Sequence, residues 1–168
     1  IPVPLHFCRD CHQNFSFENS LYEDVYLYRV SDDSMKEASL GLILISPIRE
    51  LLEERGFDVE VPGFLKGKSG ASHMFDLMAS REGISRNVTV IDLATATEGV
   101  VSEQSVIGMF AKVYDVSPDK AYLIAIPEVN ENGKRLATLY KIELIEAKGQ
   151  KEALQRLKAA MKKRSLSH

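Results

Sequence analysis

The sequence predicts an α/β fold in which a mixed β-sheet carries helices on both faces. Helix and strand patterns follow one another after about residue 34 in the order α-β-β-β-α-β-α-β-α. Residues 122–126 form a near-continuous apolar run, as in strands that are buried on both faces. Apolar residues make up 45% and charged residues 27% of the 168 residues, which is the balance of a globular protein.

The first predicted elements are a helix, a short strand and a loop. Ser46 and Pro47 predict the beginning of the helix, because Ser is a favoured N-cap residue and Pro suits the first helical position. Gly56 is expected to end it. Apolar and acidic residues then alternate over residues 57–61, which predicts a strand. Residues 66–70, Lys-Gly-Lys-Ser-Gly, predict a hairpin loop whose glycines permit positive φ.

Two further strands are predicted over residues 74–79 and 88–93, with a turn between them. Ser102 is expected to begin the next helix and Asn130 to cap the one after the apolar strand. A last strand is predicted over residues 142–145, followed by an amphipathic helix with a basic outer face. A helix that crosses from one strand to the next implies parallel pairing in part of the sheet.

The charge of the chain is unevenly distributed. Residues 148–168 hold seven basic residues and one Glu, a local net charge of +6, so the chain's net −3 leaves −9 on the remainder. This balance argues against a dedicated binder of duplex DNA, and contact with nucleic acid is expected to be weak. No apolar run reaches the roughly 18 residues of a membrane-spanning helix. No signal-peptide pattern opens the chain, so we expect a cytoplasmic protein without membrane contact.

The composition predicts three segments: residues 1–33, 34–147 and 148–168. In the first, Cys8 and Cys11 have the spacing of one zinc knuckle, which would hold Zn²⁺ between two thiolates. A structural zinc site needs four ligands, so this segment would be half of a zinc ribbon. Three hypotheses stay open: an upstream knuckle completes the site, a second chain completes it, or the two thiols hold no metal.

The stretch from Ile45 to Glu146 resembles the restriction-endonuclease-like fold, the PD-(D/E)xK superfamily. The resemblance rests on the order αβββαβ, continued here by αβα, and on the acidic residues within HMFDLMA and NVTVIDLATA. Together with the half zinc ribbon, the chain also resembles the output modules of thaumarchaeal response regulators and, more distantly, the archaeal TBP-interacting protein.

The resemblance implies where a catalytic site would lie. Active members of the superfamily hold Mg²⁺ between two acids on adjacent strands and keep a Lys two positions after the second acid. Asp76 and Asp92 stand at the two acidic positions, and Ala94 stands at the Lys position. Phosphodiester hydrolysis needs a hard cation on oxygen ligands and positive charge beside the phosphorane. The site therefore lacks its ammonium group unless Lys66, Lys68 or Lys112 replaces it.

We expect from this a non-catalytic regulatory or signalling module that binds a protein partner on a degenerate nuclease-like scaffold. The resemblance alone implies a setting in archaeal transcription or signal transduction. One alternative is a nuclease that uses Asp76 and Asp92 with Mg²⁺ and a relocated Lys. Another is a domain that binds nucleic acid weakly through Lys66 and Lys68 without cutting it. A homodimer is left open, and His73 is expected only to hydrogen-bond its loop.

Overall fold

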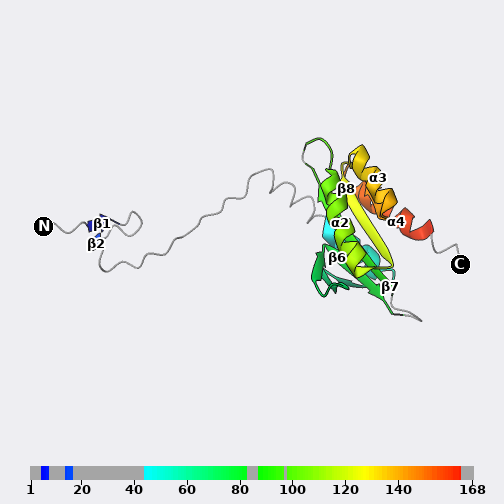
Figure 1. Cartoon of the computed structure of the whole chain (residues 1–168), viewed down its shortest axis with the longest axis horizontal. Helices are drawn as coiled ribbons and strands as arrows, with labels where there is room; N and C mark the ends of the chain where they lie inside the picture. Colours follow the sequence, from blue (N-terminus) through cyan, green and yellow to red (C-terminus); the bar gives the residue numbers. More distant parts are fainter. Residues whose placement is uncertain (1–4, 8–13, 17–43, 83–86, 97, 164–168) are drawn as a thin grey trace. The chain divides into compact units, whose positions relative to one another are not determined.

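A computed structural model describes residues 5–7, 14–16, 44–82, 87–96 and 98–163 (Figure 1). The chain divides into two compact units, Ile1–Val30 and Ser31–His168. In the first unit, β1 (Leu5–Phe7) pairs antiparallel with β2 (Asn14–Ser16). Cys8 and Cys11 lie outside the described residues, so the zinc ion predicted there stays a prediction.

The second unit is built on a five-stranded mixed sheet. Its strand order is β3-β6-β7-β8-β9. The strands are β3 (Asp58–Glu60), β6 (Leu77–Arg81), β7 (Asn87–Thr95), β8 (Lys120–Ile126) and β9 (Glu143–Glu146). The first three pair antiparallel, and β7, β8 and β9 pair parallel. The predicted α/β fold with a mixed sheet is therefore confirmed.

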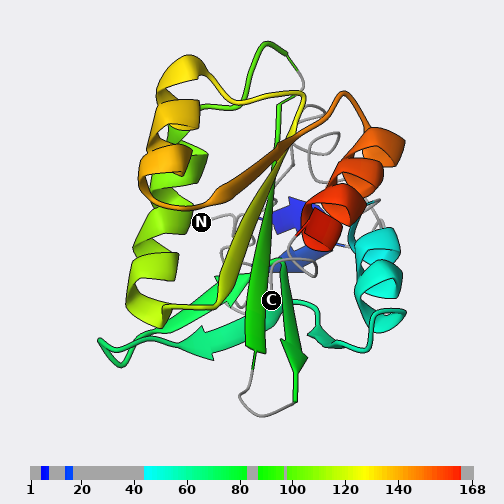
Figure 2. The same cartoon turned by 90° about the vertical axis from the view of Figure 1, so that its right-hand side faces the viewer.

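Helices cover both faces of this sheet, as Figure 2 shows. The helix over residues 44–53 and α4 (Gln150–Lys163) pack on one face, while α2 (Glu103–Val116) and α3 (Glu131–Leu139) pack on the other. Alternate side chains of β8 pack on opposite faces of the sheet. Tyr122 and Ile124 pack on the face covered by α4, and Leu123 packs on the face covered by α2 and α3. This strand is buried on both faces, as its apolar sequence predicts.

The helix ends agree with the sequence in three places and differ in one. Ser102 and Asn130 cap α2 and α3 by accepting hydrogen bonds from backbone N–H groups at 3.2 and 2.8 Å. Gly56 takes a positive φ of 77° after the first described helix. The predicted N-cap at Ser46 is wrong, because residue 44 is already helical. Leu44 is 1% exposed and packs into the core, and both Leu44 and Ile45 belong to the helix.

The strand predicted over residues 74–79 is in fact two strands. Its first part belongs to a separate hairpin of β4 (Gly63–Lys66) and β5 (Ser72–Phe75), and its second part is β6. Gly63 allows this hairpin to lie against the sheet, since a Cβ there would sit 2.3 Å from the Cβ of Met78. The predicted loop at residues 66–70 closes the hairpin, and Gly70 has a φ of 88°.

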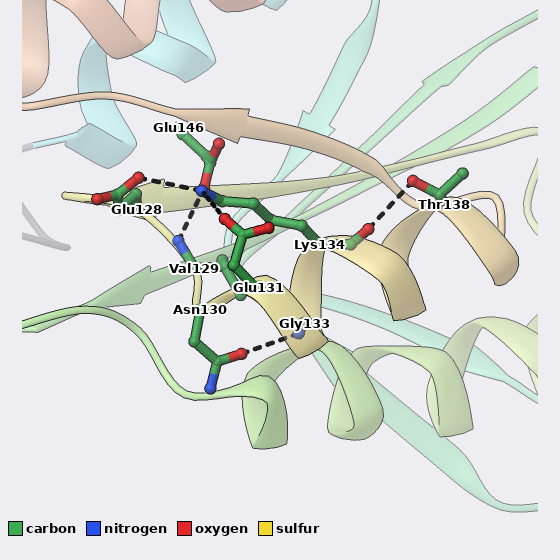
Figure 3. Close-up of polar contacts among 8 residues, drawn as sticks. All are labelled: Glu128, Val129, Asn130, Glu131, Gly133, Lys134, Thr138 and Glu146. Carbon is green, nitrogen blue, oxygen red and sulfur yellow. Dashed lines mark hydrogen bonds and ion pairs between the residues drawn. The ribbon is translucent and has the colours of Figure 1, made fainter.

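Polar contacts join the start of α3 to the end of β9 (Figure 3). The ammonium group of Lys134 lies 3.1 Å from Glu128, 3.2 Å from Glu131 and 3.6 Å from Glu146. Hydrogen bonds to Glu128 and Glu131 raise the pKa of Lys134. The backbone N–H of Val129 also donates to Oε1 of Glu146 at 2.9 Å. These contacts hold the β8–α3 turn against the neighbouring strand.

The basic C-terminal helix, α4, is part of the second unit's core. Ala153 and Leu157 are both fully buried and lie in the cluster that includes the helix over residues 44–53. Within the described part of the chain, no helix has both the length and the apolar character that crossing a membrane requires.

We predict that Leu157→Ala lowers the free energy of unfolding by about 2–5 kcal/mol, because it leaves a cavity between α4 and the sheet. Urea denaturation followed by circular dichroism measures the change. The matched control is Leu139→Ala, since Leu139 is also helical but 71% exposed, and a change within about 0.5 kcal/mol is expected there. Equal effects of the two substitutions would contradict the packing described here.

Candidate active site

Asp76 and Asp92 lie opposite each other at the point where the chain leaves the hairpin and enters β6. The neighbouring pair Leu77 and Ile91 is in register between β6 and β7. The backbone N–H of Asp76 donates to Oδ1 of Asp92 at 3.1 Å. In return, the N–H of Leu93 donates to Oδ2 of Asp76 at 2.7 Å. The resemblance placed these two acids on neighbouring strands, and the structure brings them into contact.

Lys112 reaches the same place from α2. Its ammonium group pairs with Oδ2 of Asp92 and donates to the carbonyl oxygen of Met74 at 2.9 Å. It also lies 4.7 Å from the centroid of the Phe75 ring, within the range of a cation–π contact. The side chains of Lys112 and Asp92 are only 26% and 13% exposed. The lysine tip is therefore held on several sides.

Lys112 is one of the three lysines considered as replacements for the one missing at position 94, and its ammonium group lies beside Asp92. Ala94 is 7% exposed and packs against the α2 side of the sheet, two residues after Asp92 and on the same face. The positive charge beside Asp92 comes from a helix instead of this strand. Of the three lysines considered as replacements, Lys112 pairs with Asp92, whereas Lys66 and Lys68 do not line the same cleft.

The three charged side chains line one open cleft of about 580 Å³. Ala94 on β7 and Ser105 and Gly108 on α2 form parts of its wall. A Cβ added at Gly108 would meet nothing within 4 Å, although glycine within a helix costs about 1 kcal/mol relative to alanine. The small residues on α2 therefore leave the space beside Asp92 and Lys112 free for a ligand.

Asp76 is electrostatically strained in this cleft. Burial, and to a smaller extent the charge of Asp92, raise the pKa of Asp76. The hydrogen bond from Leu93 and the charge of Lys112 act in the opposite direction without cancelling the effect. The ionised carboxyl is therefore less stable here than in water, and a cation beside it would relieve the cost.

These residues fit Mg²⁺ better than a metal held wholly by protein. Within the described ranges, no group of three or more His, Cys, Asp and Glu side chains is arranged to hold a metal ion. Mg²⁺ does not need such a group, because it keeps several waters and commonly binds one or two carboxylates. Among the described residues, the Asp76 carboxylate accepts its hydrogen bond from Leu93 through Oδ2, and Asp76 lines the cleft.

The β4–β5 hairpin is fixed to α2 by Asp115. This carboxylate accepts hydrogen bonds from the Ser69 hydroxyl at 2.5 Å and the Ser69 N–H at 2.8 Å, and contacts Nε2 of His73 at 2.7 Å. A Cβ at Gly67 would lie 1.9 Å from Oδ2 of Asp115, so a larger residue there would displace this carboxylate. His73 was expected to hydrogen-bond its own loop, and its partner is instead Asp115 of α2. Lys68 donates to the hydroxyl of Ser117 at 2.6 Å.

Sequence reasoning missed Asp115 and did not single out Lys112. A signal for Lys112 was present, because it lies three residues after the buried Met109 and so shares the inner face of the helix. For Asp115 the sequence offers no such signal, since its partners are 42 and 46 residues away.

No protein-family model matches this sequence, and neither does any curated protein. Among solved structures, the chain is similar to AF1548, a protein of unknown function, with a TM-score of 0.53 and 19% identity over 70% of this chain and 67% of that one. It is also similar to Can2 from Sulfobacillus thermosulfidooxidans, solved in complex with cyclic tetra-adenylate, with a TM-score of 0.56 and 10% identity over 92% of this chain and 41% of Can2.

The DNA modification-dependent restriction endonuclease AspBHI gives a TM-score of 0.39 and 12% identity over 82% of this chain and 40% of that one. The chain spans less than half of Can2 and of AspBHI. At these identities a likeness concerns the fold alone. The likenesses to AF1548 and Can2 therefore concern only the arrangement of the mixed sheet and its helices. The zinc ribbon and the archaeal regulatory relatives stay predictions.

We predict that Asp76→Asn stabilises the protein at pH 7. The raised pKa of Asp76 means that its ionised form destabilises the fold, whereas an amide carries no charge and still accepts the hydrogen bond from Leu93. Urea denaturation should show the gain at neutral pH. The gain should vanish at acid pH, where Asp76 is protonated in both folded and unfolded chains.

The comparison variant is Asp92→Asn, which leaves the Lys112 ammonium group without its carboxylate and should cost about 1–3 kcal/mol. Destabilisation by Asp76→Asn at pH 7 would contradict the electrostatic account of the cleft.

We also predict an acid-sensitive contribution from Asp115. Hydrogen bonds from the Ser69 hydroxyl, from His73 and from the Ser69 N–H lower the pKa of Asp115 from 3.8 to about 2. A lowered carboxyl pKa contributes stability that is fully present above the unfolded value and is lost as the pH falls through the folded one. The stability difference between wild type and Asp115→Asn should therefore hold above about pH 4 and close towards pH 2.

Urea unfolding at a series of pH values measures this difference, with Asp58→Asn as the control for loss of an exposed carboxylate. A stability difference between wild type and Asp115→Asn that stays constant between pH 4 and pH 2 would contradict the lowered pKa of Asp115.

Proposed function

We propose that this chain is a divalent-metal-dependent nuclease that hydrolyses phosphodiester bonds with Asp76, Asp92 and Lys112. The observation that carries the proposal is the ammonium group of Lys112 beside Asp92, in a cleft that Asp76 also lines. Two carboxylates and one lysine are the groups that this chemistry needs. They come together from the residue before β6, from β7 and from α2, although no motif of neighbouring residues contains all three.

Each residue has a separate role in the proposal. Asp76 and Asp92 would hold Mg²⁺ through carboxylate oxygens, and the metal would supply a Lewis acid for the scissile phosphate. Lys112 is free to leave Asp92 once a cation neutralises that carboxylate, and its flexible four-carbon chain can then turn towards the phosphate. There it stabilises negative charge as the phosphorane forms, an effect that is strong where water is partly excluded.

Two other functions remain open: a non-catalytic module that binds a protein partner, and a domain that binds nucleic acid without cutting it. The non-catalytic module that binds a protein partner was inferred from Ala94, and that argument assumed a site without an ammonium group. Lys112 supplies one, so Ala94 no longer argues against catalysis. Partner binding and a role in archaeal signalling stay predictions. Non-cleaving contact through Lys66 and Lys68 also stays a prediction, with the Lys68 ammonium hydrogen-bonded to Ser117.

We predict metal-dependent cleavage by the full chain. Labelled single-stranded and duplex DNA and RNA are incubated with Mg²⁺, with Mn²⁺ and with EDTA. Cleavage is expected with either metal and none with EDTA. Asp76→Asn, Asp92→Asn and Lys112→Met should each lower the rate on the order of 100-fold or more, as expected for loss of a group that stabilises the transition state.

The matched controls are Asp58→Asn and Lys120→Met, which lie in β3 and β8 and do not line the cleft. Both should cleave at the wild-type rate. Absence of cleavage of every substrate by folded wild-type protein in both metals would refute the proposal and favour the non-catalytic module. Activity that survives all three substitutions in the cleft would assign it to a contaminant.

A further inference from the structure

The β4–β5 hairpin presents two large apolar side chains to solvent. Phe64 is 56% exposed and Met74 is 53% exposed. They are partners in the register of the hairpin, so their side chains stand next to each other on one face. Lys66 and Ser72 are the next such pair on that face, and both are exposed. We call these four residues the outer face of the hairpin.

The opposite face of the hairpin is fixed to the rest of the unit. Phe75 is 1% exposed and packs with the α2 side of the core. His73 contacts Asp115, and Gly63 lies against Met78. The outer face is therefore held in a constant orientation and remains open, which suits a binding surface better than a mobile loop would.

This outer face continues into the catalytic cleft. Met74 lines the cleft together with Asp76 and Asp92, and its carbonyl oxygen accepts the hydrogen bond from Lys112. Met74 therefore contacts both Lys112, through its carbonyl oxygen, and Phe64, which is its partner across the hairpin. In the proposal that follows, a chain with one phosphate at the two aspartates continues over Met74 to its hairpin partner Phe64.

The chemistry of the outer face favours one occupant. An exposed aromatic ring with a cation two residues away on the same face suits a base that stacks while a neighbouring phosphate meets Lys66. Bases in a duplex are already stacked on each other, whereas a single strand has free faces. The net charge of −3 also gives little general attraction for the densely charged duplex.

A protein partner fits this surface less well. Two apolar side chains beside a lysine are much smaller than the roughly 800 Å² per partner of a stable protein interface. A second copy of the chain would also have to bury Lys66. The surface is large enough for one or two bases.

We propose that the outer face of the β4–β5 hairpin is a stacking platform that selects single-stranded nucleic acid for the cleft. One base stacks on Phe64, Met74 adapts to it, and Lys66 contacts the adjoining phosphate. The inference rests on the proposed nuclease function for its position along the substrate, but binding to the platform does not require catalysis.

The test measures binding of the full chain to fluorescent oligonucleotides by anisotropy, in EDTA so that no cleavage occurs. The probes are a 12-nucleotide poly(dT), the RNA of matching sequence and a blunt duplex of equal length. Tighter binding of single strands than of the duplex is expected. Phe64→Ala should weaken single-strand binding about 5- to 100-fold, which is the effect of losing one stacked base. Phe64→Trp should restore it, and Lys66→Met should flatten the salt dependence by about one unit of slope.

Leu139→Ala is the control, because it removes another exposed apolar side chain from a different element, α3. Thermal unfolding checks that each variant folds. Unchanged single-strand binding by folded Phe64→Ala, or equal affinity for the duplex, would overturn the platform even if wild-type protein cleaves nucleic acid. Binding that depends on Phe64 without any cleavage would uphold the platform and refute the nuclease. A dimer that Phe64→Ala dissociates, with nucleic-acid binding unaltered, would mark a protein interface and overturn the platform as well.

Discussion

The exchange of hydrogen bonds between Asp76 and strand β7 orients the two carboxylates of the cleft. Two carboxylates this close would repel each other in an open loop. Here each accepts a backbone N–H from the opposite strand, Asp92 from Asp76 and Asp76 from Leu93. Both side chains are thereby oriented before any ligand arrives. The same exchange fixes where the hairpin stops and β6 begins, so the site and the local fold share one cause.

This arrangement destabilises the ionised form of the Asp76 carboxyl. Its raised pKa shows that burial and the neighbouring carboxylate outweigh the groups that favour the anion. Lys112 compensates part of the charge through Asp92. A cleft that is unfavourable for its own charges and open to solvent is typical of sites that were selected for binding and not for stability.

The sequence predicts those parts of the structure that depend on local signals. Strand β8 was predictable from its apolar residues, and Ser102 and Asn130 from capping preferences. The sequence does not separate the hairpin from β6, because residues 74–79 are apolar apart from Asp76 and only the contacts of Gly63 and Asp76 divide them. Local patterns do not contain contacts between segments that are far apart in the sequence.

In the candidate site too, positions along a strand could be predicted from the sequence, whereas contacts between distant segments could not. Asp76 and Asp92 could be named because a resemblance specifies positions along strands. Ala94 misled, because the resemblance also specified a strand position for a charge that the fold delivers from α2. A lysine four carbons long can reach one point from several backbones, so its absence at one position does not show that the ammonium group is absent from the site.

The hairpin is an insertion between two strands that pair with each other. β3 and β6 are adjacent in the sheet, and the hairpin leaves one and rejoins the other without contributing a strand to it. Residues at its solvent side can therefore be exchanged, and its length altered, while the register of the sheet and the two aspartates stays as it is. Under the proposed function, evolution or protein engineering can in this way change the recognition of a substrate separately from its cleavage.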